Sequence, residues 1–212
     1  MAEVKTTKPN PRGRPPLSNE QVEGKRARIA EAARQLFEAE GYEAVSLRRI
    51  AKEVGCTPMS IYTYYEGKID VLRALWDDVF IDVFAKIVAA KTSNQDPTDA
   101  IKAMCVAYVQ YWLDNRASYR LVFMSAGVEQ SDVSVFVEAS PVADRYGVFL
   151  VALAAATDRP TTDIVGDAQT LICGLNGIAH SLITISSYDW ASPIKLVTNL
   201  VQGVLLCAKG RQ

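Results

Sequence analysis

The sequence is poor in the side chains that catalysis and metal binding usually require. It has one histidine and four cysteines in 212 residues, and no two cysteines form a Cys-x-x-Cys pair. This wide spacing predicts reduced, mostly buried thiols and argues against a disulfide framework or a zinc site. No nucleophile is paired with a base, and no glycine-rich phosphate loop is present. We therefore expect no metal, no cofactor and no catalytic residue.

Long apolar runs are also missing. The N-terminal stretch MAEVKTTKPNPRGRPP lacks the apolar run of a signal peptide. Later runs such as residues 146–156 are shorter than the roughly 20 residues that a membrane span needs. Apolar residues still make up 49% of the chain, which is ample for a core. These features predict a cytoplasmic protein with no membrane partner.

Neither sign of charge is in large excess, but the charges are distributed unevenly along the chain. The formal net charge is −1, yet residues 1–28 carry +4 and residues 75–212 carry −4. A basic front on an acidic body predicts that the front of the chain meets a polyanion.

No segment alternates apolar and polar residues as a half-buried strand does, so we predict an all-α fold of about nine helices. Four prolines make residues 1–17 a flexible basic arm. Three short helices follow, and a longer helix begins at about residue 67 and ends before Pro97. The remaining helices are predicted at about 98–114, 118–126, 132–156, 161–187 and 192–209.

The three front helices carry recognisable start and stop signals. Ser18 with Gln21 predicts a capping box for the first helix, and Gly41 predicts its left-handed end. Ser46 is placed to cap the second helix. Thr57 is placed to cap the third, which has proline in its first turn.

The second and third helices have the spacing of a helix-turn-helix. Ala51 is small enough for two helices to cross, Gly55 suits the left-handed turn, and Ile61 fills the space between the helices. In this motif the second helix lies in the major groove of DNA, here residues 57–65. Ile61 and Tyr65 are expected to point inward.

The outward residues of this helix are the candidate DNA contacts. Hydroxyl groups can donate to phosphate oxygens, and short side chains can reach base edges and thymine methyl groups. Met59, Ser60 and Thr63 fit base edges, and the tyrosines fit phosphates. Packing against the next helix is the alternative for Tyr62 and Tyr64. The predicted contacts on this helix are Thr57, Met59, Ser60, Tyr62, Thr63 and Tyr64.

Residues 29–75, IAEAARQLFEAEGYEAVSLRRIAKEVGCTPMSIYTYYEGKIDVLRAL, resemble the TetR/AcrR family of transcriptional regulators. Tyr64 and Tyr65 depart from the family pattern, where His and Phe are common. The resemblance implies a DNA-binding domain over 18–66 and an effector-binding and dimerisation domain over 67–212. It also implies DNA-backbone or base contacts for Ser46, Arg48 and Lys68. For Arg49, a solvated surface charge is the alternative.

The arm holds a second candidate DNA contact. Its segment PRGRPP resembles the core of an AT-hook, in which two arginines lie in a narrow A·T minor groove. This predicts minor-groove contacts for Arg12 and Arg14; a solvated tail is the alternative.

The back two-thirds of the chain is rich in aromatic residues. The family resemblance implies that a cavity for a small, often hydrophobic effector lies among these helices. Polar groups on apolar helix faces are the better candidates for orienting a ligand, and Asn176 and His180 share one face of a helix. A core position is the alternative for each. The candidate ligand residues are Tyr108, Trp112, Phe123, Asn176 and His180.

The last two long helices, 161–187 and 192–209, are apolar on two faces and therefore need a partner on each. One apolar stripe runs from Ile164 through Leu175 to Ile185. The family resemblance implies a homodimer in which these helices form a two-fold four-helix bundle.

Together these features predict a dimeric, ligand-responsive repressor that is released from a pseudo-palindromic operator by a small, largely apolar effector. Two alternatives remain open at this point. One is an enzyme or hydrophobic-ligand carrier built on a helical bundle, and the other is a DNA-binding protein that responds to no effector.

Overall fold

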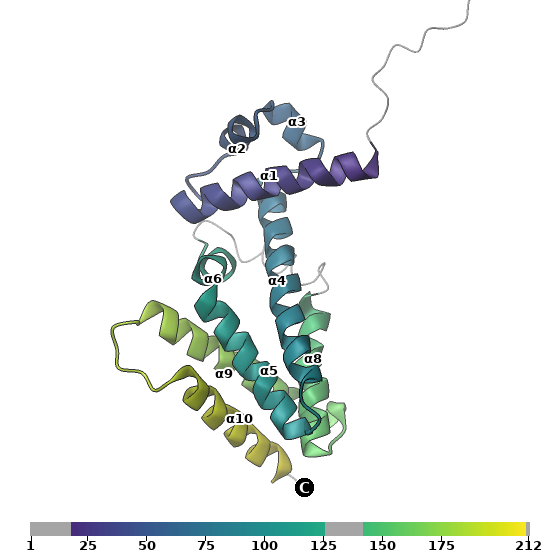
Figure 1. The fold of residues 1–212 in the computed structure, drawn as a ribbon, viewed down its shortest axis with the longest axis vertical. Coiled ribbons are helices and arrows are strands. Elements are labelled where there is room, and N and C mark those ends of the chain that lie inside the picture. Colours follow the sequence, from purple (N-terminus) through teal and green to yellow (C-terminus); the bar gives the residue numbers. More distant parts are fainter. Residues whose placement is uncertain (1–17, 126–141, 211–212) are drawn as a thin grey trace, which may run out of the picture.

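The structure, a computed structural model, describes residues 18–125 and 142–210 (Figure 1). Within these ranges every regular element is helical and no strand occurs, which confirms the predicted all-α class. The α-helices there are α1 (Asn19–Glu40), α2 (Leu47–Val54), α3 (Pro58–Tyr62), α4 (Lys68–Thr92), α5 (Pro97–Asp114), α6 (Arg116–Phe123), α8 (Val142–Thr157), α9 (Val165–Thr184) and α10 (Pro193–Lys209). The arm at 1–17 and the start of the helix predicted at 132–156 lie outside the described residues.

The helices form a small N-terminal group and a larger bundle. In Figure 1, α1 crosses the upper end of α4, and α2 and α3 lie above it. The long helix α4 runs from this group down into the bundle, where it packs along α5. Helices α8, α9 and α10 pack around α5, so α5 occupies the centre of the bundle.

The predicted caps of the front helices are confirmed. Ser18 and Gln21 form the capping box of α1, and the Ser46 side chain accepts from the Arg49 amide at the start of α2. Gly55 adopts the left-handed conformation with φ 74° and ψ 37°. Gly41 also has positive φ, 82°, but its ψ of 163° lies outside the left-handed helical region predicted for it.

Several predicted helix boundaries differ from the structure by two or more residues. Helix α3 ends at Tyr62, although residues 57–65 were expected to form one helix. The amides of Tyr64 and Tyr65 both bond to the Ile61 oxygen, which closes the last turn and lets the chain bend toward α4. The helix predicted from residue 161 begins instead at Val165, after a single 3₁₀ turn that follows Pro160.

The cysteines differ from expectation in their burial. Cys105 is buried in α5, and burial raises the pKa of its thiol. Cys56 is half-buried, whereas Cys173 on α9 and Cys207 on α10 are exposed in the single chain. The prediction of mostly buried thiols is therefore wrong for the protomer, because these two helices turn one face outward.

Much of the apolar stripe predicted to form a dimer seam lies inside the protomer, although Ile185 at its end is 50% exposed. Leu171 and Leu175 are fully buried, and Val197 and Val201 of α10 are buried with them. Helices α9 and α10 use these side chains to pack on each other, on α5 and on α8. The sequence pattern identified buried faces correctly, but it assigned them to the wrong partner.

No helix of the described ranges is both long and apolar enough to cross a lipid bilayer.

Candidate DNA-binding surface and effector site

Helix α3 presents a short exposed face at one end of the molecule (Figure 1). Met59 is 75% exposed and Tyr62 is 54% exposed. Ile61 and Tyr65 are buried, as predicted, so they fix the orientation of the helix on α1 and α4. The outward side chains are thus held on a small, firmly packed support.

The two hydroxyl residues at the start of α3 are partly engaged within the helix. The Thr57 side chain accepts from the Ser60 amide at 3.2 Å, and the two hydroxyl groups lie 2.9 Å apart in a hydrogen bond. Because a hydroxyl has one donor and two acceptor positions, each retains capacity for a further contact. Thr63 is exposed and ends the helix.

The basic side chains near α3 differ in what they already contact. Arg49 forms an ion pair with Glu40, which supports its interpretation as a surface charge. Arg48 is exposed and forms no ion pair within the part of the chain that the structure describes. Arg48 is therefore the better placed of the two to meet a phosphate or a base.

Lys68 contacts the loop between α1 and α2. Its ammonium donates to the Tyr42 main-chain oxygen at 2.8 Å and lies 3.9 Å from the centre of the Tyr42 ring. Burial lowers the pKa of Lys68, and the nearby Glu43 opposes this shift. An ammonium has three donors, so a phosphate contact by Lys68 stays a prediction alongside this structural role.

Arg26 was missed by the sequence interpretation. Its guanidinium donates to the Tyr64 main-chain oxygen at 2.8 Å and lies 4.6 Å from the centre of the Tyr65 ring. The Tyr65 hydroxyl donates to the Arg26 oxygen at 3.1 Å. The Tyr65 hydroxyl, at a position where phenylalanine is common, thus has a hydrogen-bond partner. Residues 26 and 65 are far apart in the sequence, and the fold brings them together.

The candidate ligand residues lie in an aromatic cluster of the bundle. The Tyr108 hydroxyl donates to Oδ1 of Asn176, and it lies 3.1 Å from the Tyr146 hydroxyl. Burial, aided by Tyr146, raises the pKa of Tyr108 well above its ordinary value. Three polar groups from α5, α8 and α9 therefore meet inside an otherwise apolar region.

A second polar pair lies beside this one. The Tyr119 hydroxyl is 3.1 Å from Nδ1 of His180, in a hydrogen bond whose donor depends on the histidine tautomer. His180 and Asn176 share α9, as predicted, but they reach different tyrosines. Tyr119 and Tyr146 were not predicted, because in the sequence each is one more aromatic residue on an amphipathic helix.

Trp112 connects the two polar pairs. Its ring packs edge-on against Tyr108 and Phe123, with ring centres 6.0 Å and 5.2 Å away. Its buried N–H has no hydrogen-bond acceptor within the described residues. The indole counteracts part of the rise in the pKa of Tyr108. Phe123 is 41% exposed.

Across residues 18–125 and 142–210, no group of three or more His, Cys, Asp or Glu side chains is arranged to hold a metal ion.

A helix-turn-helix at the end of a helical bundle defines a DNA-binding transcriptional regulator, and comparison with known proteins identifies the family. The family described as "Bacterial regulatory proteins, tetR family" matches residues 29–75. The family described as "Tetracyclin repressor-like, C-terminal domain" matches residues 101–191. The chain belongs to the TetR family of transcriptional regulators.

Curated relatives match the front of the chain. The HTH-type transcriptional repressor DrrR1 of Streptomyces coeruleorubidus is 46% identical over 52 residues, covering 24% of this chain and 19% of that protein. An HTH-type transcriptional regulator of Staphylococcus aureus (strain USA300) is 33% identical over 96 residues, covering 43% of this chain and 50% of that protein. The chain thus spans half or less of the length of these two relatives. Both are transcriptional regulators and not enzymes.

Solved structures share the fold over most of the chain. A bacterial regulatory protein in the tetR family from Rhodococcus RHA1 has a TM-score of 0.60 at 22% identity, over 85% of this chain and 94% of that chain. The fatty acid degradation regulator FadR from Bacillus halodurans has a TM-score of 0.67 at 17% identity, with the same coverage. At these identities the likeness concerns the fold alone.

Proposed function

We propose that this regulator is a dimeric repressor that a small, largely apolar effector releases from a pseudo-palindromic operator. The observation that carries the proposal is the exposed face of α3, where Met59, Tyr62 and Thr63 project from a helix whose inner side is fully packed. A helix of this kind enters the major groove through its outward residues. Membership of a DNA-binding family supports DNA as the partner of this face.

We assign the DNA contacts by chemistry. Met59, Ser60 and Thr63 are short enough to read base edges, while Tyr62 and Tyr64 contact phosphates through their hydroxyl groups. Ser46, Arg48, Thr57 and Lys68 add contacts at the ends of α2, α3 and α4. Arg12 and Arg14 of the arm, residues 1–17, reach the minor groove.

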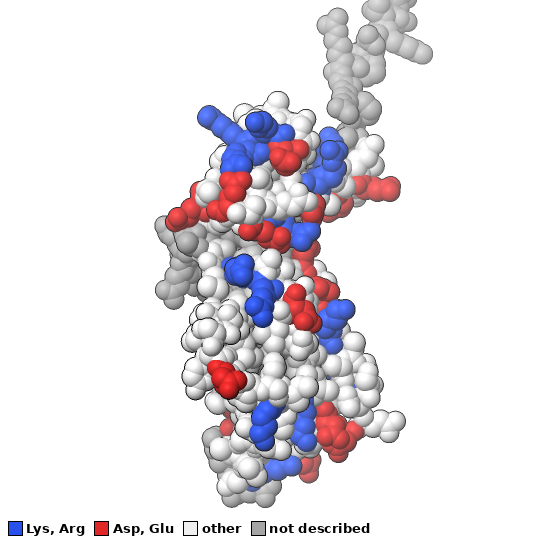
Figure 2. Space-filling model, turned by 60° about the vertical axis from the view of Figure 1, so that its left-hand side comes forward, with Lys and Arg blue, Asp and Glu red and all other residues white. Residues whose placement is uncertain are grey.

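The dimer forms, in our proposal, through the outward faces of α9 and α10. The only Asp, Glu, Lys or Arg of α9 is Asp167, which is buried. The side of α9 and α10 that comes forward in Figure 2 is largely uncharged, whereas basic side chains gather at the upper tip. Five exposed residues of α9 recur with helical spacing on one face: Gly166, Thr170, Cys173, Gly177 and Thr184.

A neutral face of small residues suits close approach by a second helix. Adding a Cβ atom at Gly177 would meet no atom of the protomer within 4 Å, so the space above it is open. Leu206 of α10 is 73% exposed and would gain burial at the same seam. A two-fold bundle of α9, α10 and their symmetry mates would cover both.

The effector site, in our proposal, is the aromatic cluster around Tyr108, Trp112 and Phe123, with Asn176 and His180 as orienting groups. Its polar groups are hydroxyl, amide, imidazole and indole, and none of the five residues named carries a carboxylate, an ammonium or a guanidinium. Such a site favours an apolar ligand with few hydrogen-bonding groups.

Communication between the two sites would run through α4 and α6. Trp76 of α4 donates from its indole N–H to the Leu121 oxygen of α6 at 2.9 Å. The chain therefore divides, in this proposal, into a DNA-binding part at 18–66 and an effector-binding and dimerisation part at 67–212. A ligand that shifts α6 would move α4 and the three helices above it.

Selection from a random duplex library tests the DNA-binding proposal. Repeated rounds with the full chain should enrich an inverted repeat, and footprinting should show two protected half-sites. Enrichment of a single unrepeated site, or of no sequence, would contradict it.

Native mass spectrometry of the purified protein tests the effector: a bound apolar molecule that lowers operator affinity supports release. Operator affinity insensitive to every compound tried would favour an effector-independent DNA-binding protein.

A further inference from the structure

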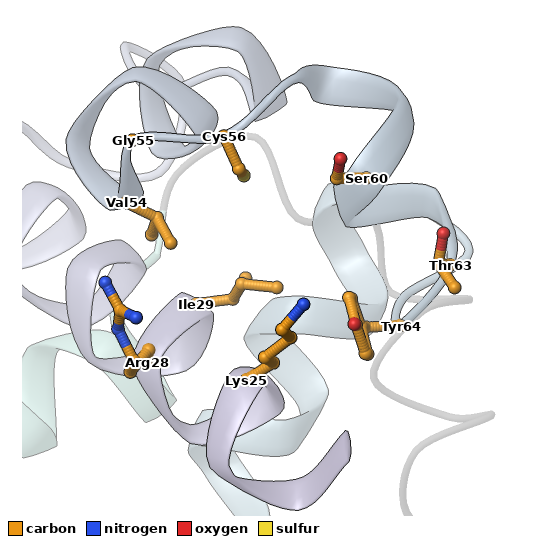
Figure 3. A pocket seen from close by; sticks show the side chains of 9 residues that line it. All are labelled: Lys25, Arg28, Ile29, Val54, Gly55, Cys56, Ser60, Thr63 and Tyr64. Carbon is orange, nitrogen blue, oxygen red and sulfur yellow. The ribbon is translucent and has the colours of Figure 1, made fainter. Parts of the chain in front are cut away.

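A basic cavity lies between α1 and the helix-turn-helix (Figure 3). Its volume is about 350 Å³. Lys25 and Arg28 enter it from α1, Cys56 from the turn, and Ser60 and Thr63 from α3. No carboxylate lines this cavity. Neither the family resemblance nor the assigned DNA contacts account for its two cations.

The two cations of this cavity form no ion pair within the described parts of the chain, although Arg28 also lines a neighbouring pocket with Glu31 and Glu53. Arg34 pairs with Glu31 and Glu38, and Arg49 pairs with Glu40. Lys25 and Arg28 form no ion pair there. The Lys25 ammonium lies 5.9 Å from the centre of the Tyr64 ring. Two cations three residues apart on one helical face repel each other unless an anion lies between them.

The cavity borders the face of α3 that we assign to DNA. Ser60 and Thr63 belong both to its lining and to that face. A DNA duplex whose major groove holds α3 has a phosphate backbone on each side of the groove. One of these backbones would pass the mouth of the cavity, because α1 flanks α3 on this side (Figure 3).

The segment of α1 that carries the two exposed cations is held in a fixed position relative to α3. Arg26 lies between Lys25 and Arg28 in the sequence, and it bonds to the Tyr64 oxygen while its own oxygen accepts from Tyr65. The segment of α1 that carries both cations is therefore joined directly to the end of the recognition helix. Side chains on such a fixed segment can set the register of α3 in the groove.

We propose that this cavity receives a backbone phosphate of the operator, with Lys25 and Arg28 as its ligands. The inference rests on the proposed function and adds a contact outside α3. Arginine can bind two phosphate oxygens at once, and lysine adds a compact charge. The contact would position the protein on DNA and read no base.

The first test compares matched pairs of substitutions in the full chain. Lys25→Gln with Arg28→Gln should weaken operator binding roughly tenfold or more, since two charge-assisted hydrogen bonds to phosphate are removed. The slope of log K against log salt should fall by roughly 0.9 for each phosphate that a protomer no longer neutralises. Lys86→Gln with Lys91→Gln on α4 removes the same charge far from α3 and should leave the slope unchanged. Equal slopes for the two double variants would overturn the proposal.

The second test locates the phosphate. Operator duplexes carrying one methylphosphonate at a time lack a single backbone charge. One position in each half-site should weaken the wild type several-fold while leaving the double variant unaffected. Coupling at no position would overturn the proposal, and the single variant Arg28→Gln takes the place of the double variant if the latter does not fold.

The remaining outcomes separate the sources of phosphate and the two proposals. If free inorganic phosphate competes with operator only when Lys25 and Arg28 are present, and no methylphosphonate position couples, the cavity is a small-anion site and not a DNA contact. If the double variant matches the wild type while both select an inverted repeat, this inference fails alone. If the wild type selects no repeat, the proposed function fails with it.

Discussion

The Tyr65 hydroxyl donates a 3.1 Å hydrogen bond to the main-chain oxygen of Arg26, and the Arg26 guanidinium lies over the Tyr65 ring at 4.6 Å. The two residues are thus joined by a hydrogen bond and by a cation–π contact. Since Arg26 also bonds to the Tyr64 oxygen, the end of the recognition helix is tied to α1. These contacts fix the position of α3 and leave the residues on its DNA-facing side free to contact DNA.

Tyr65→Phe should lower the free energy of unfolding by about 1 kcal/mol, because one largely buried hydrogen bond is removed while the packed ring remains. Urea denaturation followed by circular dichroism measures the effect. Tyr62→Phe is the matched control and should leave the unfolding free energy within about 0.5 kcal/mol of the wild type, since Tyr62 is exposed. Equal stability of the two variants would show that the Tyr65 bond is not formed in solution.

Tyr62→Phe should instead weaken DNA binding by about 1 kcal/mol, on the selected operator and on random duplex alike. A phosphate contact carries no sequence information, so both affinities fall together. Fluorescence anisotropy with the two duplexes checks this. A change in the ratio of the two affinities, without a general loss, would place Tyr62 against a base.

Residues 18–65 show how much of the fold could be predicted from sequence. Ser18, Ser46 and Thr57 were predicted as caps and act as caps, because capping depends on residues three or four positions apart. Gly55 was predicted to adopt the left-handed conformation that the turn requires, and it does. The contact between Arg26 and Tyr65 could not be predicted, since it joins residues thirty-nine positions apart.

Helices α9 and α10 show where such prediction stops. Periodicity indicated which face of each helix is apolar, but not what covers it. Leu171 and Leu175 pack inside the protomer, and the face left open consists of small neutral residues such as Gly177. In the bundle, Asn176 and His180 were predicted from their shared face, but their tyrosine partners required the packing of α5, α6 and α8.

The arm is tested by Arg12→Ala with Arg14→Ala. If both arginines lie in the minor groove, the slope of log K against log salt should fall by roughly 0.9 for each phosphate charge that the arm of one subunit no longer neutralises. The loss of affinity should be greatest on operators flanked by A·T pairs, where the groove is narrow and strongly negative. A salt titration that gives the wild-type slope would leave the arm without a role in binding.

Tyr119→Phe tests the ligand site. The substitution keeps the ring in the aromatic cluster but removes its hydrogen bond to His180. Operator affinity without effector should be unchanged, and the effector concentration that halves operator binding should rise roughly fivefold to tenfold, as expected for one hydrogen bond. Tyr188→Phe, on an exposed tyrosine, is the control. Identical effector titrations for the wild type and Tyr119→Phe would exclude this site.

The central claim is that two protomers, joined through the outward faces of α9 and α10, present two α3 helices to one operator. A substitution at Leu175 cannot test it, because Leu175→Arg would place a charge in the protomer core and unfold the chain. Gly177→Arg can test it, because the space around Gly177 in the protomer is open and arginine has a higher helix propensity than glycine.

Sedimentation velocity of Gly177→Arg, alone and with labelled operator, is the most direct measurement. We expect the wild type to sediment as a dimer and to bind the operator as one dimer. The variant should be a folded monomer by circular dichroism, with operator affinity near that for random duplex, although nothing near the DNA has changed. A Gly177→Arg protein that stays dimeric and binds the operator like the wild type would contradict the claim.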